Sequence, residues 1–354
     1  VENSRMASEI HVTLFVPLEE EAHYICNALK DQEAKMISPT SFLHGADCYV
    51  FEKKFGRSAT AQINCHVIRD MGNLRAATRI GSTLFGPHGS RDNLVILIGL
   101  AGSLDKKNVG IGDVVISNEV KSYAPDKVKK IDRKKESFYQ VPDGSESWAF
   151  KQDVESGKIS VDERDKILKD SYFRYRRRVV RWDQSTRSIG RFLREVRSDP
   201  VQLSCVDGSL LPDGFEHLAN DEPKICTGAL LGSDFVIDCD EYVRLIHEKN
   251  SDLSLDIYTQ KKGGTDHDRH DWSTSDLLAV DMESLGFFTL LRDAPGQTRT
   301  AMSIRGISDV ASEKEHLDVE TEKTLRDLAV KNAIRVAIDF VEFFASEVNT
   351  LSAR

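Results

Sequence analysis

The chain has 354 residues and a formal net charge of −9; 40% of its residues are hydrophobic and 30% are charged. No apolar run reaches the ~18–20 residues that a membrane span needs, and the acidic balance argues against a general nucleic-acid binder. Six cysteines without a C-x-x-C pair are typical of reduced core thiols in a cytosolic protein. These features exclude a transmembrane, a disulfide-rich secreted or a disordered protein, and residues 1–9 are interpreted as a leader or expression remnant.

The first third of the chain alternates between strand and helix patterns. Apolar residues at helical spacing predict a helix over Glu19–Lys30, with acids at its start, and a second helix from Asn73 to Leu84. The run Leu94–Ile98 is apolar throughout, which is typical of a strand buried on both faces, and it ends in Gly99-Leu-Ala-Gly102. The other strands expected here are Ile10–Val16, Asp113–Ile116 and the two strands of a β-hairpin, Cys48–Lys54 and Ala59–Ile68.

The rest of the chain returns to this alternation after a long interruption. Residues 121–218 contain basic clusters and turn formers, and we interpret them as an insertion in one domain that spans residues 10–354. Strands are then expected at Ile225–Leu231, Leu277–Val280 and Thr300–Ile304, and helices at Met282–Leu291 and Val319–Val348. The alternation predicts a single-domain, three-layer α/β/α fold with a central mixed or mostly parallel sheet.

Five short polar or glycine-rich segments follow predicted strands, which is where open α/β sheets place ligands. Taken singly, Asp309 could cap a turn, and the acids before Ala22 could form a solvated helix start. Glu283 follows a buried strand, where an unpaired carboxylate is costly. Three carboxylates at strand ends of one sheet together favour a functional site. The five segments are Leu18-Glu-Glu-Glu21, Asp70-Met-Gly72, Gly99-Leu-Ala-Gly-Ser103, Gly232-Ser-Asp-Phe235 with Val280-Asp-Met-Glu283, and Arg305-Gly-Ile-Ser-Asp309.

These motifs, in this order, resemble the nucleoside phosphorylase superfamily, and specifically its branch of methylthioadenosine/S-adenosylhomocysteine nucleosidases. The most specific pairing is Ala279-Val-Asp-Met-Glu-Ser284 followed by Ile304-Arg-Gly-Ile-Ser-Asp-Val-Ala311. The resemblance covers about two-thirds of the chain and implies a phosphorylase-like fold. It also implies an N-glycosidase that releases a purine base without a metal or an organic cofactor.

The resemblance implies a role for each matching residue. Asp309 corresponds to the general acid that protonates the purine leaving group, and Glu21 to the carboxylate that activates the attacking water. Glu283 corresponds to the acid that holds the ribose hydroxyls. Such chemistry needs a proton donor, a base on the opposite face and negative charge beside the developing oxocarbenium ion. The implied substrate-binding residues are Met71, Gly99, Ala101, Gly102, Phe235, Met282 and Ser308, of which Ser308 orients the general acid and Phe235 stacks on the base.

Two departures from the family pattern bear on the reaction. Leu100 stands where the family often has Ser or Thr near the phosphate or water, and the strand Leu94–Ile98 has no arginine for phosphate. Both favour hydrolysis over phosphorolysis. A phosphate-dependent phosphorylase and a nucleotide-sensing module without turnover remain the alternatives.

The basic insertion is the largest departure. Arg176, Arg177 and Arg178 could bind the phosphates of AMP or ATP, as in nucleotide-depleting immune effectors with this fold, and antiviral defence is then one role. The alternative is a solvated face or an assembly interface. We expect a homo-oligomer by resemblance and leave an activating protein partner open. The polar run Asp266–Asp271 lacks the ligand spacing of a metal site and is interpreted as a loop.

Overall fold

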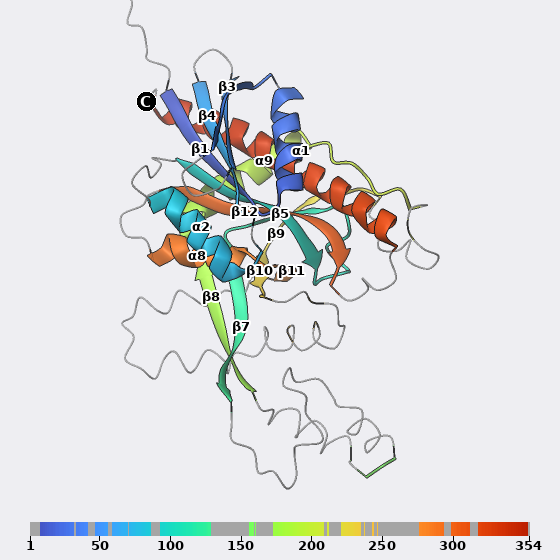
Figure 1. Ribbon diagram of the computed structural model, residues 1–354. Coiled ribbons are helices and arrows are strands. Elements are labelled where there is room, and N and C mark those ends of the chain that lie inside the picture. The colour runs from blue at the N-terminus through green and yellow to red at the C-terminus, as the bar shows by residue number, and fades with distance from the viewer. Residues whose placement is uncertain are drawn as a thin grey trace, which may run out of the picture. The chain divides into compact units, whose positions relative to one another are not determined.

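Figure 1 shows a computed structural model of the chain, in which contacts divide the residues into two units. The first unit comprises residues 1–121, 179–238 and 273–354, and the second comprises 122–178 and 239–272. All residues of the site described below belong to the first unit. The structure describes residues 8–31, 33–41, 47–55, 59–69, 71–85, 93–128, 156–158, 160, 173–208, 211, 221–234, 237, 243, 246, 276–293, 299–311 and 318–352.

Strands and helices alternate along the described chain. The strands are β1 (Ser8–Val16), β2 (Lys35–Ser41), β3 (Asp47–Phe55), β4 (Ala59–Val67), β5 (Leu94–Ser103), β6 (Val114–Ser117), β7 (Glu119–Val128), β8 (Phe173–Arg181), β9 (Ile225–Thr227), β10 (Ala229–Gly232), β11 (Leu277–Asp281) and β12 (Thr300–Val310). The helices are α1 (Glu19–Asp31), α2 (Asn73–Phe85), α5 (Thr186–Ser198), α8 (Ser284–Asp293) and α9 (Val319–Ser352), and a short 3-10 helix, η1, spans Asp183–Ser185.

The strands form one mixed sheet in the order β2-β3-β4-β1-β5-β11-β10-β7-β8. Strand β12 pairs with β5 and β6, and β6 also pairs with β9. Parallel pairing joins β1 to β4 and β5, and β5 to β12, whereas β11 runs antiparallel to β5. Because β11 is antiparallel to β5, the chain that leaves β11 continues alongside β5 toward the start of that strand.

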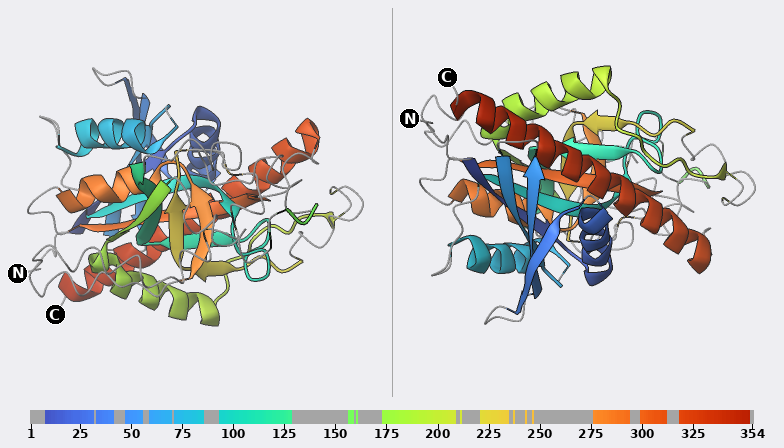
Figure 2. Two further views of the ribbon diagram at one scale, coloured as in Figure 1. Left: turned by 90° about the horizontal axis from the view of Figure 1, so that it is seen from below. Right: turned by 90° about the horizontal axis from the view of Figure 1, so that it is seen from above.

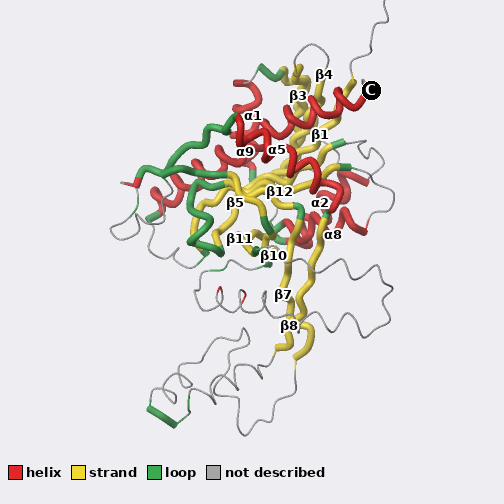
Figure 3. The backbone as a smooth tube through the Cα atoms, turned by 180° about the vertical axis from the view of Figure 1, so that it is seen from behind, coloured by secondary structure: helices red, strands yellow, loops and turns green. Residues whose placement is uncertain are grey.

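Helices cover both faces of the sheet, as Figures 2 and 3 show. Alternate residues of β1 divide between two cores: Val12 and Leu14 pack on the side of α1 and α9, and Phe15 packs on the side of α2 and α8. This period of two is what a strand buried on both faces requires. The predicted α/β fold with a mixed central sheet between helical layers is confirmed.

Two strands are longer than the sequence predicted. We expected one to end at Ile98 and another at Ile304, but β5 continues to Ser103 and β12 to Val310. The two pair in parallel along their whole length, so the ladder carries the backbone through the glycine-rich segment. The segment Gly99–Gly102 therefore lies inside a strand and does not follow one.

Other differences are smaller. The run expected at Ile225–Leu231 divides at Gly228 into β9 and β10, and β2, β7 and β8 were not predicted. The range 121–218, expected as one insertion, is shared between the two units, and in the first unit it forms η1 and α5. Among the described helices, including the 34-residue α9, none combines the length and apolar character of a membrane span.

Gly306 allows α9 to pack directly on β12. A Cβ atom at this position would overlap the carbonyl oxygen of Ala329. We expect Gly306→Ala to lower the free energy of unfolding by about 1–3 kcal/mol, because overpacking forces backbone shifts. Gly190 in α5 has no atom within 4 Å of such a Cβ. Gly190→Ala is the matched control and should stabilise the protein by roughly 0.5–1 kcal/mol. Equal effects in chemical denaturation would contradict this account.

Candidate active site

The site is built around a row of residues that crosses the sheet at Gly99. Parallel pairing sets Gly99 of β5 opposite Arg305 of β12. Because Gly99 has no side chain, the guanidinium of Arg305 occupies the space where a Cβ would lie. Pro17, just after β1, closes the other side of the same space, 3.3 Å from that Cβ position. Arg305 is thereby fully buried, with 0% of its surface exposed.

Two carboxylates from the β11–α8 connection balance this buried charge. The Nη2 atom of Arg305 lies 2.5 Å from Asp281 Oδ2 and 3.4 Å from Glu283 Oε2. The direction of β11 explains why Asp281 and Glu283 lie beside Arg305. Val280 pairs with Gly102 in the antiparallel sense, so the residues that follow it return alongside β5 toward Gly99. Residues far apart in the sequence therefore form one buried ion-pair cluster.

Hydroxyl groups fix the orientation of this cluster. Ser303 Oγ accepts a hydrogen bond of 3.0 Å from Arg305 Nε, and it lies 3.0 Å from Ser284 Oγ. The Ser284 hydroxyl donates to Asp281 Oδ2, and its backbone N–H lies 3.3 Å from Asp281 Oδ1. Burial raises the pKa of Asp281, whereas Arg305 acts to lower it. Asp281 thus anchors the first turn of α8 as well as the guanidinium.

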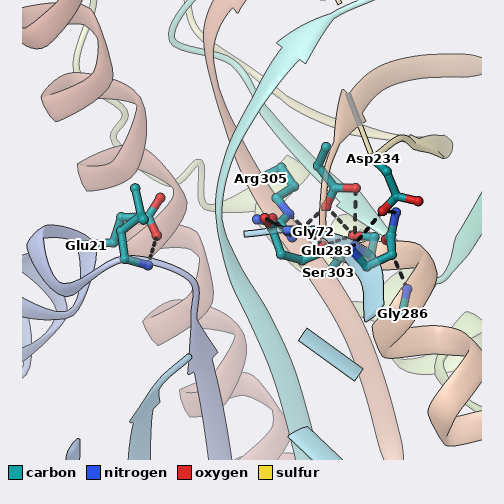
Figure 4. Close-up of polar contacts among 11 residues, drawn as sticks. Glu21, Gly72, Asp234, Glu283, Gly286, Ser303 and Arg305 are labelled. Atoms are coloured by element: carbon teal, nitrogen blue, oxygen red, sulfur yellow. Dashed lines mark hydrogen bonds and ion pairs between the residues drawn. The ribbon is translucent and has the colours of Figure 1, made fainter. Parts of the chain in front are cut away.

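Glu283 is buried between this guanidinium and a backbone amide. Its Oε1 accepts a 3.5 Å hydrogen bond from Gly72 N–H, at the start of α2. Gly72 has a φ of +99°, which L residues rarely adopt. Burial raises the pKa of Glu283 to about 7, Asp281 raises it further, and Arg305 and the Gly72 amide oppose the rise. Figure 4 shows Arg305, Gly72 and Glu283 grouped together.

Glu21 is the second buried glutamate of the site. It stands in the first turn of α1, where its Oε2 accepts a 3.0 Å hydrogen bond from Leu18 N–H. Only 4% of its surface is exposed, and burial raises its pKa to about 7. Arg305 acts to lower this pKa and Glu283 to raise it, so the two glutamates share one electrostatic environment. Figure 4 shows Glu21 to one side of the Glu283 cluster.

Asp309 lies further along β12, within the strand and not after it. The register between β12 and β5 shifts between Ile307 and Asp309, and this shift sets Asp309 opposite Gly102. A Cβ on Gly102 would lie 2.7 Å from Asp309 Oδ1, so the glycine makes room for the carboxylate. Ser308 Oγ donates a 2.8 Å hydrogen bond to Asp309 Oδ2. Because Val280 also pairs with Gly102, Asp309 sits level with the end of β11.

The other residues expected at the site differ in exposure. Met282 is half-buried, Met71 is 55% exposed, and Ala101 belongs to the core under α2 and α8. Their roles in binding stay predictions. The following lie outside the described residues: Asp70, Phe235, the side chains of Arg176, Arg177 and Arg178, and the run Asp266–Asp271.

Arg305, Asp281 and Asp234 stand within the sequence motifs, but their roles were not predicted, and Asn73 was predicted only as a helix start. A usable signal existed for Arg305. An arginine within an apolar strand is costly to bury unless carboxylates pair with it. No comparable signal marked Asn73, whose contacts depend on the tertiary fold.

Comparison with known proteins addresses the fold. No family model matches the sequence, and no curated protein matches it either. Among solved structures, a methylthioadenosine/S-adenosylhomocysteine nucleosidase from Helicobacter pylori has a TM-score of 0.53 at 12% identity, covering 94% of this chain and 98% of that one. The chain shares the fold of this nucleosidase.

Two further structures share this nucleosidase fold. Native futalosine hydrolase from Helicobacter pylori has a TM-score of 0.51 at 12% identity, covering 94% of this chain and 97% of the other. The Colwellia psychrerythraea methylthioadenosine/S-adenosylhomocysteine nucleosidase, in complex with adenine, has a TM-score of 0.50 at 13% identity, covering 95% and 96%. At such identities the likeness concerns architecture, and chemistry must be argued from the residues.

Removing the buried guanidinium should be far more damaging than removing an exposed one. Arg305→Met leaves Asp281 and Glu283 buried without their cation, and we expect a loss of about 3–5 kcal/mol in the free energy of unfolding. The control is Arg292→Met, which breaks an exposed 2.9 Å pair with Asp293 and should cost at most about 1 kcal/mol. Urea denaturation measures both. Similar losses would contradict the pairing described.

The raised pKa values also predict how stability depends on pH. Glu21 holds its proton more tightly in the folded chain, with a pKa of about 7 against an ordinary 4.5. The contribution of Glu21 to the free energy of unfolding is therefore fully present below pH 4.5 and is lost as the pH rises through 7. Relative to the wild type, the free energy of unfolding of Glu21→Gln should rise by up to about 3 kcal/mol between about pH 5 and pH 8. Glu20→Gln, at the exposed neighbour, should follow the wild type. Parallel curves of the free energy of unfolding against pH for Glu21→Gln and the wild type would contradict a raised pKa of Glu21.

Proposed function

We propose that the protein hydrolyses the N-glycosidic bond of a purine nucleoside or nucleotide and releases the free base. The observation that carries this proposal is the pair of buried glutamates, Glu21 and Glu283, each with a pKa near 7 and both within the field of Arg305. A carboxyl group with such a pKa exchanges its proton near neutral pH, as a general base must. Glu21 follows the end of β1 and Glu283 follows the end of β11, and the carboxyl ends of strands are where open α/β sheets bind ligands, which supports the proposal.

Glu21 is suited to activate the attacking water. In its ionised form it takes one proton from water while the oxygen attacks the anomeric carbon of the ribose. The Leu18 amide holds one carboxylate oxygen, which leaves the other for the water. Burial makes the carboxylate a stronger base than an exposed glutamate, because desolvation disfavours its charged form.

Asp309 is suited to protonate the departing purine. The purine leaves with the electron pair of the C–N bond and is a poor leaving group unless a proton reaches its ring. Asp309 supplies that proton, and the Ser308 hydroxyl orients its carboxyl group by donating to Oδ2. One proton then passes from water to Glu21 and one from Asp309 to the base, so the products are the free sugar, which keeps its 5′ group, and the neutral purine.

Glu283 is suited to hold the ribose hydroxyls. Its carboxylate accepts their hydrogen bonds and places negative charge beside a sugar that becomes cationic in the transition state. Gly72 N–H and Arg305 fix the two carboxylate oxygens from the protein side. This anchoring supports a role in which Glu283 is oriented before substrate arrives.

The state of Arg305 favours water over phosphate as the nucleophile. A phosphorylase needs a cation that reaches its phosphate. Arg305 is fully buried and paired with Asp281 and Glu283, so it is committed to the protein's own carboxylates. We therefore favour hydrolysis, in agreement with the expectation from Leu100.

The base is proposed to be adenine, because the Colwellia structure of this fold holds adenine. The 5′ group of the sugar is either a thioether or a phosphate. In the second case, Arg176, Arg177 and Arg178 would be its partners. A homo-oligomer and an activating partner stay predictions.

Base release from methylthioadenosine, adenosine, AMP and ATP in phosphate-free buffer tests this function. We expect free adenine, measured by chromatography, and Asp309→Asn should reduce its rate by roughly 10²–10⁴-fold, the usual contribution of general acid catalysis. The control Asp293→Asn makes the same change at an exposed position and should leave the rate unaltered.

The panel also separates the alternatives. Release from AMP or ATP would assign a nucleotide substrate, and release from methylthioadenosine alone would assign a nucleoside. Release that appears only when phosphate is added, with ribose 1-phosphate as product, would replace hydrolysis by phosphorolysis. No release under either condition would overturn the enzymatic proposal.

A further inference from the structure

Asn73 joins three elements that meet beside Glu283. It is the first residue of α2, and its side chain is buried, with 6% exposed. Its Nδ2 group and its backbone N–H donate to the same acceptor, Asp234 Oδ1, at 3.0 and 3.1 Å. Its Oδ1 accepts a 3.1 Å hydrogen bond from Gly286 N–H in the first turn of α8. Figure 4 shows its partners Asp234 and Gly286 next to the Glu283 cluster.

The packing around Asn73 leaves little freedom. A Cβ on Gly286 would overlap the carbonyl oxygen of Asn73, so α8 approaches the start of α2 backbone to backbone. Asp234 follows the end of β10 by two residues and caps the first turn of α2, where N–H groups lack partners within the helix. Asn73 is therefore held from both sides, by Asp234 and by Gly286.

This arrangement sets the position of Glu283. Gly72, whose amide donates to Glu283, immediately precedes Asn73, and Gly286 follows Glu283 by three residues. Asn73 thus connects the two segments that carry the donor, Gly72, and the acceptor, Glu283. At 3.5 Å this hydrogen bond is at the long limit, so a small shift of the α2 start would break it.

We propose that Asp234 and Asn73 are positioning residues that hold Gly72 N–H on Glu283 and so align the carboxylate that receives the ribose. This inference rests on the proposed function. Asp234 also directly precedes Phe235, the residue expected to stack on the base. The same aspartate therefore connects Glu283, proposed to hold the ribose, with the segment expected to contact the purine.

The chemistry of the Asp234 contact gives a sharp pair of variants. A single oxygen, Oδ1, accepts both hydrogen bonds from Asn73, and a carbonyl oxygen could do the same. Asp234→Asn keeps such an oxygen without the charge, whereas Asp234→Ala removes it. If the contact positions Glu283, Asp234→Asn should retain activity and Asp234→Ala should lose it. Asp221→Ala, at an exposed residue of the same region, is the control for the alanine change.

The substrate provides a readout that a merely structural role would not move. We would compare kcat/KM for the compound of the panel that releases adenine fastest with kcat/KM for its 2′,3′-dideoxy analogue, which lacks the hydroxyls assigned to Glu283. For the compound that carries both hydroxyls, Asp234→Ala should lower kcat/KM at least tenfold, because a misplacement of ~1 Å can cost ~10²-fold. For the dideoxy compound the same variant should match the wild type.

Hydrogen exchange provides a second readout that does not depend on turnover. In Asp234→Ala, amides in residues 72–76 and 284–288 should exchange faster, whereas those of β5 should exchange as in the wild type. Equal losses of activity on both nucleosides, or unchanged exchange at both helix starts, would overturn the positioning role. A wild-type protein that releases no base would instead overturn the proposed function, and exchange alone would then report on the Asn73 contacts.

Discussion

The buried guanidinium of Arg305 is the constraint on which the rest of the site depends. A charge without access to solvent is costly unless carboxylates pair with it and its hydrogen-bond donors are used. Gly99 provides the space, since any larger residue would collide with the guanidinium. Asp281 and Glu283 provide the negative charge. Strand β11 is antiparallel to β5, and this direction brings the two acids beside Arg305. A parallel β11 would carry them away from the guanidinium.

The single positive charge of Arg305 interacts with three buried carboxyl groups and cannot neutralise all of them. Asp281 is its shortest ion pair, and Glu283 and Glu21 receive weaker compensation while being almost as deeply buried. Desolvation therefore prevails over attraction, and the pKa values of both glutamates rise to about 7. Acid–base capacity at neutral pH thus follows from an incomplete balance of charges, and a second arginine in this space would abolish it.

Sequence patterns singled out individual residues of this candidate site but not the contacts that hold them together. Glu21, Glu283 and Asp309 could be singled out because acids beside apolar strands are visible in one dimension. Gly99 and Gly102 were expected to approach a ligand, yet each makes room for a side chain of the neighbouring strand, Arg305 and Asp309 respectively. That relation depends on the β5–β12 register, which no local pattern encodes. For the same reason β5 and β12 were predicted too short, since a glycine-rich run suggests a turn until its partner strand is known.

The strand that carries Arg305 and Asp309 is also packed closely against helix α9. Alternate residues of β12 face opposite layers: Arg305 faces the carboxylates, and Gly306 meets the backbone of Ala329 in α9. Helix α9 is itself tied down through Asn332, which donates to the carbonyl oxygens of Gly112 and Ser204. A shift of β12 that relieved the buried charges would drive Gly306 into α9. The unfavourable electrostatics therefore persist in the folded chain as raised pKa values, and this rigid support is what a preorganised catalytic site requires.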